Sequence, residues 1–162
     1  MSRSFWSGRR VFLTGHSGFK GGWLALCLRE MGAEVYGYSL APDTAPSLYD
    51  SARLAECVAG EFADIRDAET IKHIFTTRKP EVVFHAAALK HLPLLETYPT
   101  EAYQTNVLGT LTLLEASAQA GVGVFVNIST DKAANPISVL GYSKRIAERV
   151  TAHFGINSTT GK

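Results

Sequence analysis

Three glycines near the start of the chain have the spacing of a loop that binds phosphate groups. The segment TGHSGFKG begins at Thr14 and carries Gly15, Gly18 and Gly21. A pyrophosphate needs backbone N–H groups pointing towards it and no side chains in the way, and glycine meets both demands. An apolar run precedes the segment and a helical pattern follows it, so a helix N-terminus would face the anion. The motif predicts a site for NAD or NADP; the alternative is a glycine-rich turn without a ligand.

The residues that would hold the adenosine ribose leave the choice between NAD and NADP open. Dinucleotide sites of this type usually carry an acidic residue at the end of the second strand. Here Ser39, Leu40 and Ala41 occupy that place, and the nearest acidic residue, Asp43, lies slightly beyond it in the sequence. No arginine stands there to bind a 2′-phosphate, and this lack of positive charge slightly favours NAD.

A second group of residues, late in the chain, could move protons. Asp131 and Lys132 follow a predicted strand, at the end where open parallel sheets bind ligands. Lys132 could act as a base if its pKa is lowered, and Asp131 as an acid if its pKa is raised; a solvated Asp–Lys pair without function is the alternative. On the next predicted helix, Leu140 shares a face with Lys144, whereas Tyr142 projects from another face.

The elements that would position these residues alternate between strand and helix along the chain. Strands are predicted at residues 11–13, 34–39, 55–59, 81–88 and 122–129, and helices at residues 19–31, 67–77, 100–120 and 139–154. Such alternation indicates a parallel sheet with right-handed crossovers. The predicted fold class is therefore α/β, a doubly wound parallel sheet of the Rossmann type. Residues 1–162 would form one NAD(P)-binding domain.

Composition excludes several other classes of function. The 162 residues are 46% hydrophobic and 19% charged, with a net charge of +1. We therefore expect a packed core and no partner held by charge, neither nucleic acid nor a membrane. The apolar run after the N-terminus is too short for a signal peptide or a membrane span. Cys27 and Cys57 are interpreted as buried reduced thiols, which favours a cytoplasmic protein. The histidines lack metal-ligand spacing, so no metal is expected.

The motifs resemble those of the extended short-chain dehydrogenase/reductase superfamily. Residues 11–40, with GHSGFKGGWL and MGAEVYGYSL, are similar to CDP-glucose 4,6-dehydratases. Residues 85–162 are more similar to capsule-type UDP-N-acetylglucosamine 4,6-dehydratases, in HAAALKHLPLLE, TNVLGT, ISTDKAANP and GINSTTGK. Proteins of this superfamily continue with later strands and a small sugar-binding lobe, which are absent from this chain. The resemblance also implies a homo-oligomer in which long helices pair between subunits.

The resemblance implies a role for each matching residue. The cofactor would be held by Thr14, Gly15, Ser17, Gly18, Phe19 and Gly21 at the pyrophosphate, Asp64 and Ile65 at the adenine, and Ala86, Ala87, Ala88 and Lys90 after the fourth strand. The implied catalytic residues are Thr130, Asp131 and Lys132, which would face the sugar, and Lys144, which would hydrogen-bond the nicotinamide ribose. Asn106 matches a helix asparagine of the superfamily; a surface or helix-bending role is the alternative.

The implied activity is that of an NAD(P)-dependent nucleotide-sugar 4,6-dehydratase, a lyase acting on a UDP- or CDP-hexose. Carbon 4 is oxidised, water is eliminated across carbons 5 and 6, and hydride returns to carbon 6. Leu140 stands where most of the superfamily carries a proton-transferring tyrosine. Some capsule-type members carry Met there, so proton transfer by Thr130, Lys132 or water is one interpretation. A non-catalytic NAD(P)-binding module is the second, and an epimerase or reductase of the same superfamily is the third.

Overall fold

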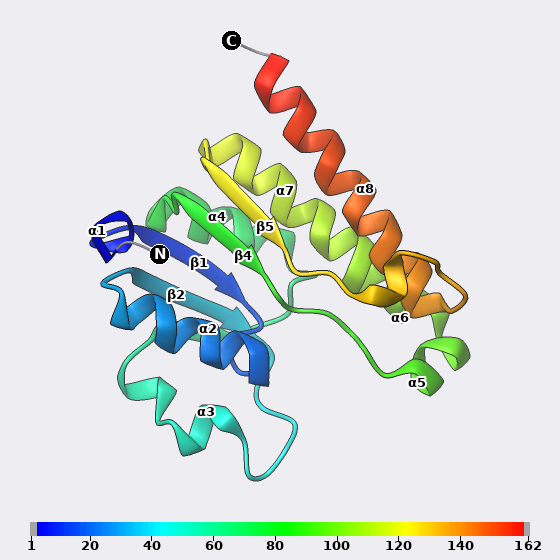
Figure 1. The fold of residues 1–162 in the computed structure, drawn as a ribbon, viewed down its shortest axis with the longest axis horizontal. Coiled ribbons are helices and arrows are strands. Elements are labelled where there is room, and N and C mark those ends of the chain that lie inside the picture. The colour runs from blue at the N-terminus through cyan, green and yellow to red at the C-terminus, as the bar shows by residue number, and fades with distance from the viewer. Residues whose placement is uncertain (1–2, 161–162) are drawn as a thin grey trace.

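The computed structural model describes residues 3–160, with side chains described for residues 4–155. Within that part of the chain, five parallel strands form one sheet in the order β3-β2-β1-β4-β5 (Figure 1). They are β1 (Arg10–Thr14), β2 (Glu34–Ser39), β3 (Ala59–Phe62), β4 (Val82–His85) and β5 (Val124–Asn127). The chain starts in the middle of the sheet, winds outwards to β3 and crosses back to β4 and β5. The doubly wound Rossmann-type order predicted from the sequence is therefore confirmed.

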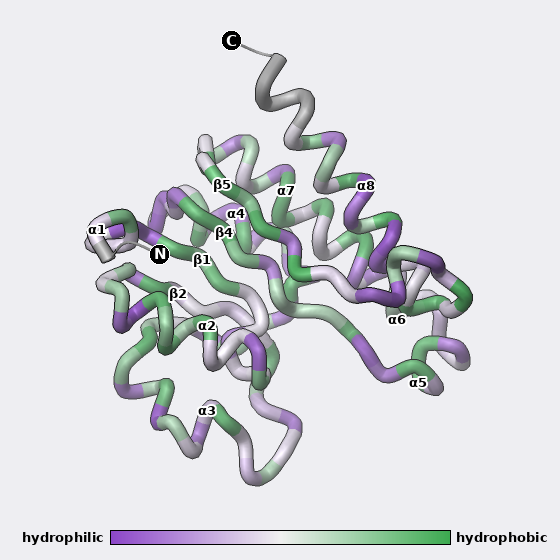
Figure 2. Tube along the Cα trace, in the orientation of Figure 1, coloured by the Kyte–Doolittle hydropathy of each residue, from purple (hydrophilic) through white to green (hydrophobic). Residues whose placement is uncertain are grey.

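Helices cover both faces of the sheet (Figure 1). On one face lies α2 (Phe19–Glu30); on the other lie α4 (Ala68–Arg78), α7 (Gly109–Ala120) and α8 (Val139–Thr160). Side chains of a strand alternate between the two layers, so Val11 and Leu13 join the core under α2 while Phe12 joins the core under α4 and α7. Figure 2 shows hydrophobic residues along the central strands β1 and β4. Burial on both faces explains why the strands read as apolar runs.

Local signals in the sequence set the ends of the main helices. The Asp67 carboxylate caps α4 by accepting a hydrogen bond from the Thr70 N–H at 3.1 Å. Gly121 ends α7 with a φ of 70°, a left-handed conformation that glycine adopts without strain. The glycine loop leads directly from β1 into α2, so the N-terminus of α2 lies at the carboxyl end of the strands.

The predicted strand at residues 55–59 is wrong. Leu54–Glu56 form a short 3-10 turn, η1, and β3 starts only at Ala59. The Leu54 carbonyl accepts hydrogen bonds from the N–H groups of Cys57 and Val58, which bends this segment away from the sheet. Leu54 is fully buried, so its apolar character reflects packing of the turn. β4 and β5 occupy only the centres of the predicted ranges 81–88 and 122–129, because the chain leaves the sheet towards the site described below.

The predicted helix at residues 100–120 is divided into three segments. It consists of α6 (Pro99–Ala102), a π-helical stretch η2 (Tyr103–Leu108), and α7. A π segment is rare and has no signature in hydrophobic periodicity. The short helices α1 (Arg3–Trp6), α3 (Leu48–Ser51) and α5 (Leu92–Thr97) have too few residues to show a period. α8 continues past the predicted end at residue 154; residues 161 and 162, which end the motif GINSTTGK, lie outside the described residues.

The two cysteines are not both buried, contrary to the prediction. Cys27 is exposed and Cys57 is half-buried. α2 presents Ala25 and Leu28 to the sheet, and Cys27 lies on the opposite side of that helix. None of the described helices is long and apolar enough to cross a membrane. The described residues contain no group of three or more His, Cys, Asp or Glu side chains that could hold a metal ion.

Candidate cofactor and active site

The glycine loop is folded too tightly for side chains at two of its three glycines. Gly15 has a φ of 77°, and a Cβ there would lie 2.8 Å from the Ala87 nitrogen. A Cβ at Gly21 would lie 2.6 Å from the carbonyl carbon of Gly15, which is closer than non-bonded atoms approach. The Gly18 N–H donates to the Gly15 carbonyl at 3.1 Å and closes the turn. The loop therefore requires glycine at residues 15 and 21 for steric reasons.

The first turn of α2 leaves backbone N–H groups for an anion. Its N-cap residue, Gly18, is extended, no side chain caps the helix, and the first turn contains no acidic residue. The positive end of the helix dipole adds about 0.3–1 kcal/mol for an anion at such a place. Together with the open glycine loop, these groups fit the pyrophosphate of a dinucleotide.

Ser17 and Phe19 contribute to this loop in different ways. The Ser17 side chain is turned towards β2: its Oγ donates to the Leu40 carbonyl at 2.8 Å. The Ser17 N–H donates to Ser39 Oγ at 3.3 Å. The Phe19 side chain is exposed, so its backbone N–H is the group that can face a phosphate. Ser17 thus holds the loop against the sheet, while Phe19 offers its main chain.

Asp64 and Ile65, the residues expected at the adenine, follow β3. Ile65 is buried in the core beneath α4 and α7. The Asp64 carboxylate is held by Arg66, whose NH2 and Nε donate to Oδ2 at 2.6 and 2.8 Å. Burial opposes ionisation of Asp64, but the hydrogen bonds and charge of Arg66 outweigh it and lower the pKa of Asp64. Arg66 also contacts Glu101 at 3.2 Å, so it ties the segment after β3 to α6.

The segment after β4 is held by the last residue of β1. Thr14 Oγ1 accepts hydrogen bonds from the N–H groups of Ala86 and Ala87, both at 3.1 Å. Ala86, Ala87 and Ala88 are half-buried, and Lys90 is exposed. Thr14 therefore sets the path of the small residues next to the glycine loop, and Lys90 lies beyond them.

A buried chain of hydrogen bonds connects this segment with α7. His85 joins Thr14 Oγ1 through Nδ1 at 2.8 Å and Thr110 Oγ1 through Nε2 at 2.9 Å, and Thr110 Oγ1 donates to the Asn106 carbonyl at 2.7 Å. Because a carbonyl only accepts, Thr110 donates to it, His85 donates from Nε2, and Thr14 donates to Nδ1. Burial, followed by the charge of Lys144, lowers the pKa of His85 to about 3. The ring is therefore neutral.

Asn106 is fully buried in the π-helical stretch, so the alternative of a surface residue is wrong. Its Oδ1 accepts from the Leu89 N–H at 2.9 Å, and its Nδ2 donates to the Leu89 carbonyl at 3.0 Å. Nδ2 also donates to Ser143 Oγ at 3.0 Å. One amide thus joins the segment after β4 to helix α8.

Thr130, Asp131 and Lys132 lie together at the carboxyl end of β5, at the start of the short turn η3 (Asp131–Ala133). Thr130 Oγ1 donates to Asp131 Oδ1 at 2.9 Å, and Lys132 Nζ lies 3.6 Å from the same oxygen. A raised pKa was the condition for Asp131 to act as an acid, and the pKa of Asp131 is instead lowered. The hydrogen bond from Thr130, then the charge of Lys132, lowers the pKa of this exposed carboxyl.

Lys144, on α8, approaches the chain just before this group. Its side chain is buried, and Nζ donates to the Ile128 carbonyl at 2.7 Å. Burial lowers the pKa of Lys144. Leu140, one turn earlier, is buried in an apolar cluster with Leu95 and Ala102. Tyr142 is 56% exposed, as its place on another helix face predicts, and cannot take the place of a phenol at residue 140.

These groups converge because the strands are parallel and in register. Thr14 pairs with Tyr38 on one side and His85 on the other, and His85 pairs with Asn127. The glycine loop, the alanines after β4 and the Thr130–Lys132 segment therefore leave the sheet at one edge. The structure brings the sequence-predicted site residues to this edge.

A family model described as polysaccharide biosynthesis protein matches residues 33–162. The chain belongs to this family. It is 47% identical over 133 residues to the CDP-glucose 4,6-dehydratase of Salmonella typhimurium, which covers 82% of this chain and 37% of that protein. With the capsular polysaccharide biosynthesis protein CapD of Staphylococcus aureus it shares 48% identity over 88 residues, 54% of this chain and 15% of CapD.

The fold has solved counterparts. The UDP-glucose 4-epimerase of Thermotoga maritima, crystallised with UDP-glucose, superposes with a TM-score of 0.79 at 27% identity. The match covers 90% of this chain and 50% of the epimerase. The predicted membership of the extended short-chain dehydrogenase/reductase superfamily is thus confirmed. The chain spans half or less of these relatives.

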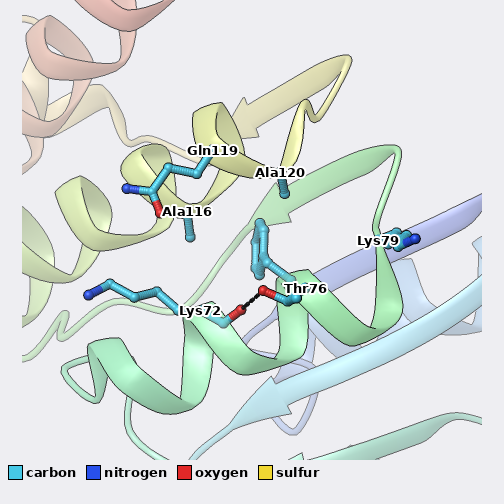
Figure 3. Close-up of a pocket in the computed structure, with 7 residues that line it drawn as sticks. Lys72, Thr76, Lys79, Ala116, Gln119 and Ala120 are labelled. Carbon is cyan, nitrogen blue, oxygen red and sulfur yellow. Dashed lines mark hydrogen bonds between the residues drawn. The ribbon is translucent and has the colours of Figure 1, made fainter.

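A cavity of about 280 Å³ lies between helices α4 and α7, away from these groups (Figure 3). It is lined by residues of α4 and α7 and the residue that follows α4, namely Lys72, Phe75, Thr76, Lys79, Ala116, Gln119 and Ala120. Most of them belong to the C-terminal turns of these helices, which lead into the amino ends of β4 and β5. The cavity is therefore at the opposite edge of the sheet from the glycine loop.

Three residues that help to build the site were not predicted from the sequence. Arg66 fixes Asp64, Thr110 completes the hydrogen-bond chain of His85, and Ser143 joins Asn106 to α8. Their partners are 2, 25 and 37 residues away in the chain. For Arg66 the charge pair with Asp64 was a readable signal; for the other two, no local pattern indicates the contact.

Proposed function

We propose that this chain is the cofactor-binding part of a nucleotide-sugar 4,6-dehydratase. The observation that carries the proposal is the group Thr130, Asp131 and Lys132 at the carboxyl end of β5, close to buried Lys144. This group shares a sheet edge with the glycine loop, so a dinucleotide on the loop would extend towards it. Similarity to a CDP-glucose 4,6-dehydratase supports the same function. The substrate would be a UDP- or CDP-hexose.

NAD is the cofactor that the site favours. Ser39, Leu40 and Ala41 at the end of β2 offer no positive charge to a 2′-phosphate. The nearby guanidinium of Arg66 already pairs with Asp64 and Glu101. When bound, NAD would accept hydride from carbon 4 of the hexose and return hydride to carbon 6. Lys144 would hydrogen-bond the nicotinamide ribose.

Thr130 and Asp131 can replace the missing tyrosine in handling the proton of the carbon-4 hydroxyl. Thr130 Oγ1 already donates to the ionised Asp131 carboxylate. Thr130 would accept the hydroxyl proton and pass its own proton to Asp131. Asp131, once protonated, would donate to the carbon-6 hydroxyl, which leaves as water. Lys132 would remove the proton from carbon 5 and later return a proton to that carbon.

Product analysis tests this proposal. The protein expressed from its complete gene is incubated with NAD and either CDP-glucose or UDP-N-acetylglucosamine. A 4-keto-6-deoxy sugar, lighter by one water, is expected from one of them. Asp131→Asn and Lys132→Gln should lose this product, while Lys72→Gln, at the cavity between α4 and α7, should retain it. Consumption of neither substrate would end the dehydratase proposal.

Two other functions would give different results in the same assay. A 4-epimer of either substrate would indicate an epimerase of the same superfamily. A non-catalytic module would bind NAD, yield no product, and remain inactive when Leu140→Tyr restores the phenol. The dehydratase proposal is favoured over both because Leu140 is buried and apolar while Thr130, Asp131 and Lys132 form one connected group.

A further inference from the structure

His16, the third residue of the segment TGHSGFKG, is turned inwards and lies on the sheet. Its side chain is 1% exposed although it belongs to a loop. The ring lies parallel to that of Phe62 from β3, with centroids 6.0 Å apart, and edge-on to Tyr49 from α3 at 5.6 Å. A histidine that served only as loop surface would not be enclosed in this way.

A glycine in β2 makes room for this ring. A Cβ at Gly37 would lie 2.7 Å from His16 Nδ1 and still closer to Cγ and Cδ2. Gly60 pairs with Gly37 across β2 and β3, and a Cβ at Gly60 would lie 2.5 Å from the Gly37 carbonyl oxygen. The imidazole therefore lies directly on Gly37, in a seat that a methyl group at residue 37 would fill.

Hydrogen bonds then tie the seated ring to the rest of the loop. His16 Nδ1 is 3.0 Å from Ser39 Oγ, Ser39 Oγ is 2.9 Å from Ser17 Oγ, and Ser17 Oγ donates to the Leu40 carbonyl at 2.8 Å. Because the carbonyl only accepts, each hydroxyl must donate towards it, and His16 must donate from Nδ1. Burial lowers the pKa of His16 to about 4, which is consistent with a neutral ring that carries its one proton on Nδ1.

We propose that His16 is a positioning residue that holds the phosphate-binding loop on the sheet through the seat at Gly37 and the chain His16–Ser39–Ser17. The inference rests on the proposed function, because it assumes that a dinucleotide lies on this loop. It also gives Ser39 a role at the place of the usual ribose-binding carboxylate. Here its hydroxyl is directed at the loop, between His16 and Ser17.

Two substitutions separate the hydrogen bond from the packing. His16→Asn keeps a donor close to the place of Nδ1 but loses the ring, whereas His16→Phe keeps a ring on Gly37 but loses the donor. Calorimetric titration with NADH should give a dissociation constant about tenfold weaker for His16→Phe, the effect of losing one hydrogen bond of ordinary strength. His16→Asn should stay within about threefold of the wild type on the same scale.

A double-mutant cycle tests the seat itself. Gly37→Ala should weaken NADH binding about tenfold or more, because its methyl group displaces the ring and with it the loop. In a His16→Ala background the same change should have no further effect, since the space is then empty. Gly155→Ala, on a helix with open space around the glycine, is the matched control and should leave binding unchanged.

The outcomes distinguish this inference from the proposed function. A wild-type chain that binds no NADH at millimolar concentration overturns both. Wild-type binding with an equal affinity in His16→Phe overturns the positioning role alone. If the losses of NADH affinity caused by His16→Ala and Gly37→Ala simply add in the double variant, the claim that His16 packs on Gly37 to hold the loop is overturned. Equal losses in thermal stability for the Asn and Phe variants, with a loss of NADH affinity only in Phe, support the role in cofactor binding over a merely structural one.

Discussion

Replacing Asn106 by alanine should destabilise the fold more than its position in a helix suggests. The side chain is buried and makes three hydrogen bonds, two to the backbone of Leu89 and one to Ser143 Oγ. Asn106→Ala leaves the N–H and the carbonyl of Leu89 without these partners, at about 1–3 kcal/mol for each buried group. Leu89 is half-buried, so water can reach it in part. We expect a loss near the lower end, about 2–3 kcal/mol.

Urea unfolding followed by circular dichroism measures this loss, and a thermal scan should show a midpoint about 4–12 °C lower for a domain of this size. Ser117→Ala is the matched control. Ser117 is also buried, but its Oγ donates to the Leu113 carbonyl within the same helix, so about 1 kcal/mol or less is expected. A free energy of unfolding for Asn106→Ala within 1 kcal/mol of the wild type would refute the claim that this amide joins the segment after β4 to α8.

The glycine loop, the neutral histidines and the outer face of α8 each give a further prediction. Gly21→Ala should abolish NADH binding in calorimetry, because its methyl group would overlap the Gly15 backbone; normal affinity would contradict the steric argument. His16 and His85 have folded pKa values of about 4 and about 3, below the unfolded value of 6.5. As the pH falls below 6.5, the two histidines therefore take up protons in the unfolded chain but stay neutral in the folded protein. The free energy of unfolding should be constant above pH 7 and fall towards pH 4 by up to about 1.4 kcal/mol per pH unit for each histidine. Urea titrations at neutral and acidic pH measure this, and equal values would contradict neutral burial. Tyr142 and Ile146 are 56% and 46% exposed on α8. We expect a homo-oligomer that Ile146→Glu dissociates in sedimentation, whereas a wild type that is monomeric at micromolar concentration would argue against it.

The features that the sequence predicted correctly depend on residues close together in the chain. The glycine loop, the Asp67 cap and the stop at Gly121 each act within a few residues, so their spacing is visible in the sequence. The apolar runs of β1 and β4 likewise reflect burial on two faces of the sheet. Parallel strands all end at the same edge of the sheet, so the sequence also predicted that the loops after β1, β4 and β5 lie at one edge. These signals were sufficient to expect the Thr130–Lys132 segment at the same edge of the sheet as the loop.

The features that the sequence did not show depend on distant contacts. Residues 55–59 were predicted as a strand, yet Leu54–Glu56 form a 3-10 turn that packs on the buried Leu54, and β3 begins only at Ala59. The lowered pKa of Asp131 arises from the hydrogen bond of the Thr130 hydroxyl and then from the charge of Lys132, an arrangement that residue type alone does not reveal. The inward turn of His16 requires Gly37, 21 residues later. Periodicity carries no information on such a pairing.

The buried polar residues support a common purpose for this edge of the sheet. Apart from Ser47 and Ser117, they are Thr14, His16, Ser39, His85, Asn106, Thr110, Ser143 and Lys144. Each hydrogen-bonds to a loop or helix that surrounds the carboxyl ends of the strands. Burying a polar group is unfavourable unless it is hydrogen-bonded, and an apolar core would be cheaper to fold. His16 and His85 illustrate the consequence: one donates from Nδ1 and the other from Nε2, so their partners hold the two rings in different tautomers. Stability alone does not require such directional order, whereas a loop whose amide groups must meet a phosphate does.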